Sequence, residues 1–469
     1  MTTDEMALNT SRPDDGSFRD PDSQVVHADG RVLRRLSATG RNDWEALSCS
    51  SFFERNVAAG RLVATAHMAA EPDALGDGWA GMVEHERVPF VTYPFEWTFG
   101  MLAAGAALHL ELLRDALAEG MTTKDGYAYN VQWRGVEPVF IDTSSFTPYQ
   151  EGPWAGYRQF CETFLNPLML RSFVGLDFHP WLRGSLEGIP VQDMRRLISL
   201  REVHRPGVLR HVVLHALFVR KAHGTTSSTR SALAESGFSR DVVITTVDKL
   251  LDVVRKLSWR PEPSTWTSYP TTNTYTDDDR VRKLRFVEKV VSSARPDLVW
   301  DLGCNDGTYA RVAATHASQV VAMDADHATV ELLYRSLRSS GVRNVLPLVI
   351  DVADPSPSLG WRNRERPALL LRPRPDLVMC LALVHHLAIV DNIPLSQVVE
   401  WLAALAEVAV VEFVDRHDPM VAQLLGNKSV VHADYSLTRF QHEIAEHFDI
   451  EAREELSAGT RTLYALRRR

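Results

Sequence analysis

Residues 298–307, Leu-Val-Trp-Asp-Leu-Gly-Cys-Asn-Asp-Gly, constrain the fold of this chain more than any other stretch. A short apolar run ends in an acid, glycines follow at Gly303 and Gly307, and a helix-like segment begins at Thr308. This order predicts a buried parallel strand, a tight turn and a helix N-terminus. Glycine lets the backbone turn sharply and approach a ligand closely, and the helix N–H groups then point at that ligand.

Three further apolar runs lead into polar residues. The run 319–323 ends in Asp324, 21 residues after Gly303, where an acid can accept hydrogen bonds from both hydroxyls of a ribose. The run 345–350 ends in Asp351, placed to meet an adenine amino group, and a fourth run from Asp376 leads into two histidines. Strands that alternate with helices in this way predict a doubly wound parallel α/β sheet.

The ordered segments DLGCNDG, VVAMDAD, LVIDVAD and DLVMCLALVHHL resemble the motifs of class I S-adenosylmethionine (SAM)-dependent methyltransferases, over roughly residues 265–469. The resemblance implies a Rossmann-like sheet of seven strands, the last one antiparallel, with SAM as cofactor. NAD is the second ligand to consider for such a turn, and a turn without a ligand is the third reading. Asn305 stands where the common pattern has a glycine, and Asn tolerates unusual φ and ψ better than most residues. The residues implied at the cofactor are Tyr275, Asp301, Gly303, Cys304, Asn305, Gly307, Asp324, Ala325, Asp351, Val352 and Leu381.

The candidate catalytic residues follow from the chemistry of methyl transfer. A hydroxyl acceptor benefits from a general base, whereas an amine acceptor can lose its proton to solvent. His385 and His386 follow the fourth strand, where an acceptor would approach, and histidine titrates near neutrality. Glu412, at the end of the fifth strand, is the second candidate base. The alternative is that one histidine packs against the sheet and caps the next loop.

The first half of the chain shows a different pattern. A strand-rich lobe at 31–93 precedes a long amphipathic helix at 100–119, which Gly120 ends. The spacing of Asp125, Asn130 and Asp142 then resembles the catalytic loop of the protein kinase and aminoglycoside phosphotransferase superfamily. That resemblance implies an α+β bilobal domain in which Asp125 handles an acceptor hydroxyl while Asn130 and Asp142 hold Mg²⁺.

Two features predict that this kinase-like domain is degenerate. No lysine precedes Lys124, although a kinase needs one for the nucleotide phosphates, and there is no convincing glycine-rich loop. We therefore expect four segments: a flexible tail (1–29), the kinase-like domain (30–235), a helix and linker (236–279) and the methyltransferase domain (280–469). Smaller expectations are that Lys283 and Arg285 lie on the exposed side of a helix and that 362–374 is a solvated loop.

Composition narrows the partners. A net charge of −9 argues against a nucleic acid, since phosphate binding needs a basic face. Four cysteines without a CxxC pair predict a reducing cytoplasm and no structural metal. No apolar run reaches the length of a membrane span, so no membrane is expected. No feature of the sequence indicates an oligomeric state.

The combination of both halves resembles methyltransferases of the nodulation-protein type, which carry an N-terminal kinase-like region. It also resembles bifunctional kinase–methyltransferases that cap polysaccharides. The leading hypothesis is therefore SAM-dependent O-methylation of a hydroxylated small molecule or glycan, with the N-terminal domain as scaffold or acceptor-binding lobe. One alternative is a bifunctional enzyme that also uses ATP and Mg²⁺ to phosphorylate its acceptor. The other is a non-catalytic binding or scaffold protein.

Overall fold

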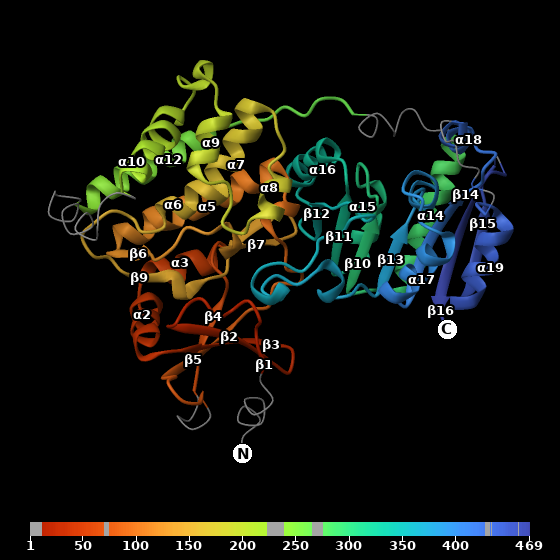
Figure 1. The fold of residues 1–469 in the computed structure, drawn as a ribbon. Helices are drawn as coiled ribbons and strands as arrows, with labels where there is room; N and C mark the ends of the chain where they lie inside the picture. Colours follow the sequence, from red (N-terminus) through yellow and green to blue (C-terminus); the bar gives the residue numbers. More distant parts are fainter. Residues whose placement is uncertain are drawn as a thin grey trace. The chain divides into compact units, whose positions relative to one another are not determined.

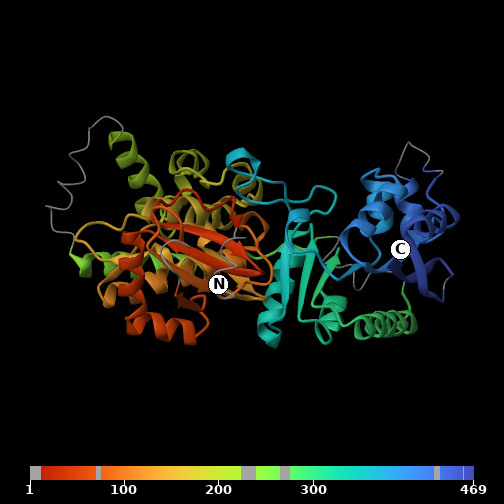
Figure 2. The same ribbon diagram turned by 90° about the horizontal axis from the view of Figure 1, so that it is seen from below.

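The computed structural model describes residues 12–69, 75–222, 239–264, 275–426, 432, 434–457 and 459–469. The chain divides into two compact units (Figure 1; Figure 2 from below). As far as they are described, unit 1 holds Met1–Trp133, Pro138–Arg260 and Ser358–Pro367, and unit 2 holds Arg134–Glu137, Pro261–Pro357 and Ala368–Arg469. Among the described residues, no helix combines the length and apolarity needed to cross a lipid bilayer.

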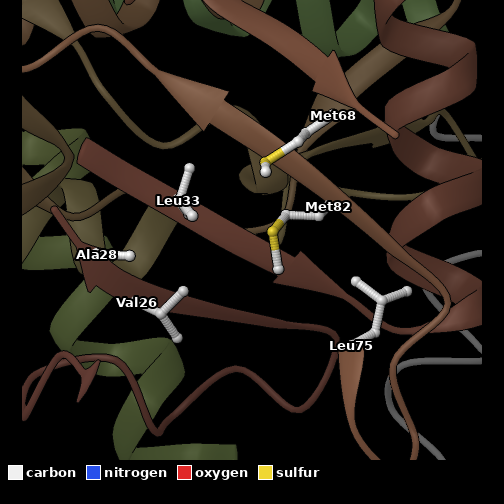
Figure 3. Close-up of a cluster of buried hydrophobic side chains, with 6 residues drawn as sticks. All are labelled: Val26, Ala28, Leu33, Met68, Leu75 and Met82. Carbon is white, nitrogen blue, oxygen red and sulfur yellow. The ribbon is translucent and has the colours of Figure 1, made fainter. Parts of the chain in front are cut away.

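Unit 1 begins with an antiparallel sheet in the order β1-β2-β3-β5-β4. Its strands are β1 (Arg12–Pro13), β2 (Ser23–Ala28), β3 (Arg31–Leu36), β4 (Thr65–Met68) and β5 (Gly81–His85). Alternate residues of β2 and β3 point to one face, where Val26, Ala28 and Leu33 form a core with Met68, Leu75 and Met82 (Figure 3). The tail predicted for 1–29 is therefore wrong over β1 and β2, because β2 buries apolar side chains in this core.

The remainder of unit 1 is mainly helical. The long helix α5 (Phe99–Ala118) begins where the Thr98 side chain accepts a hydrogen bond from Met101 N, and Gly120 follows it with φ +80°. The flanking helices are α2 (Ala38–Ser48), α3 (Ser51–Ala58), α6 (Tyr157–Phe160), α7 (Asn166–Met169), α8 (His179–Gly184), α9 (Val191–Leu197), α10 (His215–Ala222) and α12 (Arg240–Lys256), with π-helical turns η4 (Cys161–Leu165), η5 (Leu170–Val174) and η7 (Leu209–Leu214). Two short strand pairs follow: β6 (Met121–Thr123) with β9 (Phe146–Pro148), and β7 (Val131–Arg134) with β8 (Glu137–Phe140), of which Arg134 and Glu137 belong to unit 2.

A short excursion of the chain between two strands of unit 2 belongs to unit 1. Within Ser358–Pro367, Glu365 is 3% exposed and accepts hydrogen bonds from Arg19 Nε at 2.7 Å and Nη2 at 2.9 Å. Arg366 places its guanidinium 4.7 Å from the centre of the Tyr129 ring. The prediction of a solvated loop at 362–374 is wrong for Glu365 and for the buried Arg372, because both have packed surroundings.

Unit 2 is a seven-stranded sheet in the order β12-β11-β10-β13-β14-β16-β15. Neighbours from β12 to β14 are parallel, and β16 lies antiparallel between β14 and β15, which confirms the predicted doubly wound α/β sheet with an antiparallel last strand. Its elements are α14 (Asp277–Ala294), β10 (Leu298–Leu302), α15 (Thr308–Ala314), β11 (Gln319–Asp324), α16 (His327–Ser340), β12 (Val345–Val349), β13 (Leu377–Cys380), η10 (His386–Val390), α17 (Leu395–Leu405), β14 (Val408–Val414), α18 (Pro419–Gly426), α19 (Leu437–His447), β15 (Phe448–Glu455) and β16 (Arg461–Arg468).

Candidate functional site

The tight turn predicted between β10 and α15 is present, and three of its residues have positive φ. Gly303 has φ +69°, Asn305 φ +47° and Gly307 φ +74°, so Asn305 does adopt the left-handed conformation for which glycine is the usual choice. The N–H groups of Gly303 and Cys304 both donate to Met323 O, at 2.9 Å each, and so hold the turn against β11. The Cys304 side chain is buried beneath this turn.

Asp324 ends β11 directly beside that turn. Its Oδ2 accepts Asn305 N–H at 3.0 Å and its Oδ1 accepts Asp326 N–H at 2.9 Å, while Ala325 between them is exposed. Burial raises the pKa of Asp324, although these backbone donors oppose the rise. Each carboxylate oxygen keeps a lone pair, so the group can still accept two hydrogen bonds from a diol.

Asp301, on β10, is 2% exposed, and its Oδ2 has no hydrogen-bond partner among the described residues. Burial raises the pKa of Asp301 to about 7, even though the nearby Lys283 ammonium lowers it. A buried carboxyl oxygen without a donor is costly unless a ligand supplies one. The site therefore suits a ligand that brings a positive charge to Asp301.

The remaining cofactor candidates lie along the same edge of the sheet. Asp351 follows β12 and is exposed, and its Oδ1 accepts Ala353 N–H at 2.9 Å, with the half-buried Val352 next to it. Leu381, after β13, is buried, and the next residue, Ala382, has φ +51°. A non-glycine residue in this region is strained, and such strain gathers at functional sites.

The two histidines after β13 differ in exposure. His385 is 2% exposed, and nothing in the described part of the chain gives its Nδ1 a hydrogen bond. Burial, reinforced by His386, Arg461 and Lys283, holds the pKa of His385 well below its usual value. Burial also lowers the pKa of His386 to about 4. Both imidazoles are therefore neutral at physiological pH, and the Nδ1 of His385 has no partner among the described residues.

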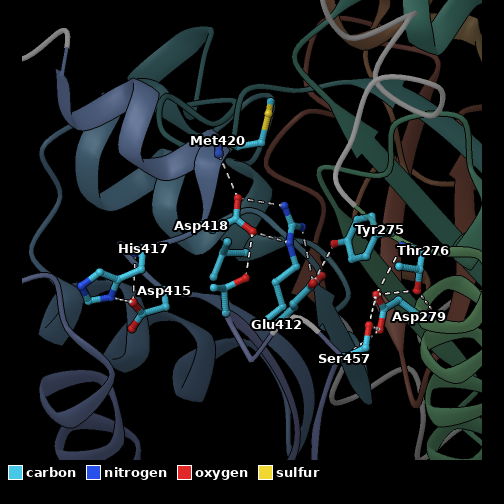
Figure 4. A network of polar contacts seen from close by, with 12 residues as sticks. Tyr275, Thr276, Asp279, Glu412, Asp415, His417, Asp418, Met420 and Ser457 are labelled. Atoms are coloured by element: carbon cyan, nitrogen blue, oxygen red, sulfur yellow. Dashed lines mark hydrogen bonds and ion pairs between the residues drawn. The ribbon is translucent and has the colours of Figure 1, made fainter.

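Glu412 sits in a buried polar network (Figure 4). It is fully buried, its Oε2 accepts from Lys283 Nζ at 2.6 Å, and its Oε1 accepts from the Tyr275 hydroxyl at 2.6 Å. Arg461 Nη1 lies 3.7 Å from Oε1, and Arg461 Nε donates to Asp418 at 2.8 Å. Burial raises the pKa of Glu412, but Lys283 and Arg461 outweigh it and the net pKa is lowered. A carboxylate held in this way is a poor base, so the arrangement does not favour a catalytic Glu412.

Lys283 is a residue of this network that the sequence reading placed wrongly, and Arg461 and Asp418 are two that it did not name. It is 2% exposed rather than on the solvent side of α14, whereas Arg285 is exposed as expected. Its ammonium lies 4.9 Å from the Tyr275 ring centre and 4.4 Å from that of Tyr309. A signal was present: Lys283 falls on the stripe of α14 that also carries the buried Phe286, Val287 and Val291.

Tyr275 is held in place by the start of α14. Thr276 and Asp279 form a capping box, and Asp279 Oδ1 accepts Ser457 N–H at 2.8 Å (Figure 4). These contacts anchor the residue that precedes them. The methyltransferase resemblance also offers Trp266 and Tyr269 as aromatic residues that would close over the cofactor, and both lie outside the described residues.

The acidic residues predicted in the first half of the chain lie in unit 1. Asn130 Nδ2 donates to Asp125 Oδ1 at 2.7 Å. Asp142 Oδ1 accepts from Arg34 Nη1, also at 2.7 Å. Asp125 and Asp142 are near enough to repel, and burial together with Asp142 raises the pKa of Asp125 to about 7.

The chain was compared with protein families and with solved structures. No family model matches the chain. Two similar solved structures are magnesium protoporphyrin IX methyltransferase (ChlM) from Synechocystis PCC 6803 and N-methyltransferase NodS from Bradyrhizobium japonicum WM9. The first is 20% identical, covering 42% of this chain and 88% of that one at a TM-score of 0.30. The second is 10% identical, covering 41% and 97% at a TM-score of 0.31. Because these TM-scores are low, the fold of unit 2 is assigned from its own strand order.

The relative matches almost end to end. Nodulation protein NoeA from Rhizobium meliloti (strain 1021) is 35% identical over 461 residues, which are 97% of this chain and 95% of that protein. Both units fall within this match. The chain belongs to the family of nodulation protein NoeA.

Proposed function

We propose that unit 2 is a SAM-dependent methyltransferase that O-methylates a hydroxylated small molecule or glycan. The observation that carries this proposal is the convergence of Asp301, the Gly303–Gly307 turn and Asp324 at the carboxyl edge of neighbouring parallel strands. Ligands bind at this edge in doubly wound sheets, where the strand order reverses on either side of β10.

The residues present fit SAM. Its sulfonium and ammonium groups are cationic, and Asp301 offers a buried carboxyl oxygen that lacks a partner among the residues described. Its ribose is a diol, and Asp324 retains one lone pair on each oxygen. The glycine turn, Asn305, Cys304, Ala325, Asp351, Val352 and Leu381 would complete the cofactor side, with Tyr275 at the entry. NAD also contains ribose, but unlike SAM it carries two phosphates that the site would have to bind.

SAM supplies an electrophilic methyl group when it is bound. The chain then has to align the acceptor, exclude water and take up the hydroxyl proton. His385 suits the last task, because its imidazole is neutral and no described residue occupies its Nδ1, which would accept the proton in the Nε2–H tautomer. Glu412, engaged by Lys283 and Tyr275, is not available for it.

Unit 1 is proposed to hold the acceptor or to shape its binding cleft. The support is that the relative shares the whole chain, so the two units have been kept together in both proteins. A hydroxylated acceptor would find carboxyl, amide and hydroxyl partners in the Asp125, Asn130 and Asp142 region.

Calorimetric titration with SAM tests the proposal. We expect Asp324→Asn to bind SAM at least about tenfold more weakly than the wild type, because one ribose acceptor becomes an amide donor. The matched control is Asp278→Asn, an exposed acid in the first turn of α14, which should bind SAM like the wild type. A wild-type protein that binds NAD and not SAM would disprove the proposal.

A further inference from the structure

Arg34 stands at the centre of the polar cluster of unit 1. It lies on β3 and is 8% exposed, and it forms an ion pair with Asp142 Oδ1 at 2.7 Å. The same Nη1 donates to Ser23 Oγ at 3.2 Å and to Ser144 Oγ. Ser144 in turn donates to Asp142 Oδ1 at 2.7 Å. The guanidinium and its carboxylate partner therefore share the Ser144 hydroxyl.

A second chain of hydrogen bonds fixes the other side of this guanidinium. Arg34 Nε donates to His85 Nε2 at 3.1 Å, so that nitrogen carries no proton. The proton is then on His85 Nδ1, which lies 2.9 Å from Thr65 Oγ1, and Thr65 donates to Val63 O at 3.1 Å. Every donor in this series of hydrogen bonds has an acceptor. Arg34 is thus held rigidly by the sheet and aimed at Asp142.

Asp142, the acid that Arg34 contacts, is one of the two residues for which the phosphotransferase resemblance implies Mg²⁺, and Asn130 is the other. Mg²⁺ needs free oxygen ligands in a nearly octahedral arrangement. Asp142 Oδ1 is already bound to a guanidinium, which stays protonated at any relevant pH and matches a carboxylate well. Asn130 directs its amide nitrogen at Asp125. A divalent ion would have to displace Arg34 or lie against it, so the residues do not fit Mg²⁺.

We propose that Arg34 is the resident cation of this acidic cluster, taking the place of a divalent metal, so that unit 1 binds neither Mg²⁺ nor a Mg²⁺–nucleotide there. This cluster is then independent of metal ions, and the proposal stands apart from the methyltransferase activity proposed for unit 2.

The proposal is tested by measuring Mn²⁺ binding to the full-length protein. Binding is monitored as the loss of the electron paramagnetic resonance signal of the free ion. The variants are Arg34→Met and Arg34→Met/Asp142→Asn. We expect no Mn²⁺ site at this cluster in the wild type, and affinity at least about tenfold higher in Arg34→Met, because removing the cation frees Asp142. The double variant should lose that gain, which separates this site from adventitious sites elsewhere. An Arg34→Met protein that folds and gains no Mn²⁺ affinity would overturn the proposal.

A second comparison keeps the proposal testable if Arg34→Met does not fold, as near-ultraviolet circular dichroism would reveal. Asp142→Asn in the wild-type background should leave Mn²⁺ binding unchanged, since Asp142 is already occupied by Arg34. Wild-type protein that binds Mn²⁺ and loses this binding in Asp142→Asn would show a true metal site and refute the proposal. SAM titration of each variant reports separately on unit 2.

Discussion

At the scale of single residues, the turn after β10 concentrates backbone strain where a ligand would bind. Gly307 has φ +74°, and a Cβ added there would lie 2.4 Å from Leu333 Cδ1. Leu333 is buried on α16 and has little freedom to move away. Gly341, at the end of the same helix, has φ +71° but open space around it. The two glycines share a conformation and differ only in packing.

That pair yields a matched prediction. Gly341→Ala should cost roughly 1–2 kcal/mol, the price of a left-handed alanine. Gly307→Ala should cost a further ~1–3 kcal/mol from overpacking against Leu333. Chemical denaturation, followed through the transition of unit 2, measures both. Equal losses for the two variants would mean that Leu333 moves aside freely.

His385 is the residue on which the proposed chemistry depends. Once a screen with labelled SAM has identified an acceptor, His385→Gln should lower kcat by about 10²–10⁴-fold, the usual contribution of a general base. SAM affinity should stay unchanged. Because the pKa of His385 is well below its usual value, wild-type kcat should already have reached its plateau by pH 6.5. An activity that instead rises through pH 8 would point to another base.

At the scale of elements, α14 links several parts of unit 2 through one buried charge. Lys283 pairs with Glu412 on β14 and faces Tyr309 on α15. The two side chains are 3% and 0% exposed, so neither charge is shielded by solvent. Removal of one partner of such a pair leaves an uncompensated charge in a medium of low polarity.

Lys283→Met should therefore lower the free energy of unfolding of unit 2 by about 3–5 kcal/mol. Arg285→Met, an exposed change on the same helix, should stay within about 0.5 kcal/mol of the wild type. The double variant Lys283→Met/Glu412→Gln should be more stable than Lys283→Met alone, because it no longer buries the carboxylate that has lost its lysine. Thermal and urea denaturation can compare the three. A loss in Lys283→Met no larger than in Arg285→Met would contradict the buried pair.

At the scale of the whole molecule, unit 1 packs a histidine into an aromatic cluster. His109 on α5 is fully buried among Phe140, Trp154, Phe160 and Phe164. Burial lowers its pKa from 6.5 to about 3. Below pH 6.5 the unfolded chain binds a proton that folded unit 1 does not, so stability falls as the pH falls towards 3.

This gives a prediction for acid stability. Between pH 6 and 4, His109 should make the free energy of unfolding of unit 1 fall by up to ~1.4 kcal/mol for each pH unit. His109→Phe should reduce the slope by that amount. Phe164→Leu, in the same cluster, should lower stability while leaving the slope unchanged. Denaturant titrations of unit 1 at several pH values provide the measurement, and an unaltered slope in His109→Phe would refute the assignment.

The sequence by itself determined the parts of this protein that depend on neighbouring residues. Apolar runs that end in acids predicted the parallel strands, and the glycines on either side of Asn305 predicted a tight turn, in which all three residues have positive φ. Asp301 and Asp324 could be placed at one edge because parallel strands end at the same side of a sheet. Periodicity and backbone sterics act over a few residues, so they can be read without the fold.

Only the tertiary structure decided which buried charges are paired. Lys283 meets Glu412 from 129 residues away, Arg34 meets Asp142 from 108, and Arg19 meets Glu365 from 346. The sequence reading placed Lys283 and the Glu365 segment in solvent, and for Asp142 it named Mg²⁺ rather than an arginine as the partner. A charged side chain is buried only where packing brings its counter-charge, and no local pattern records a partner so far along the chain.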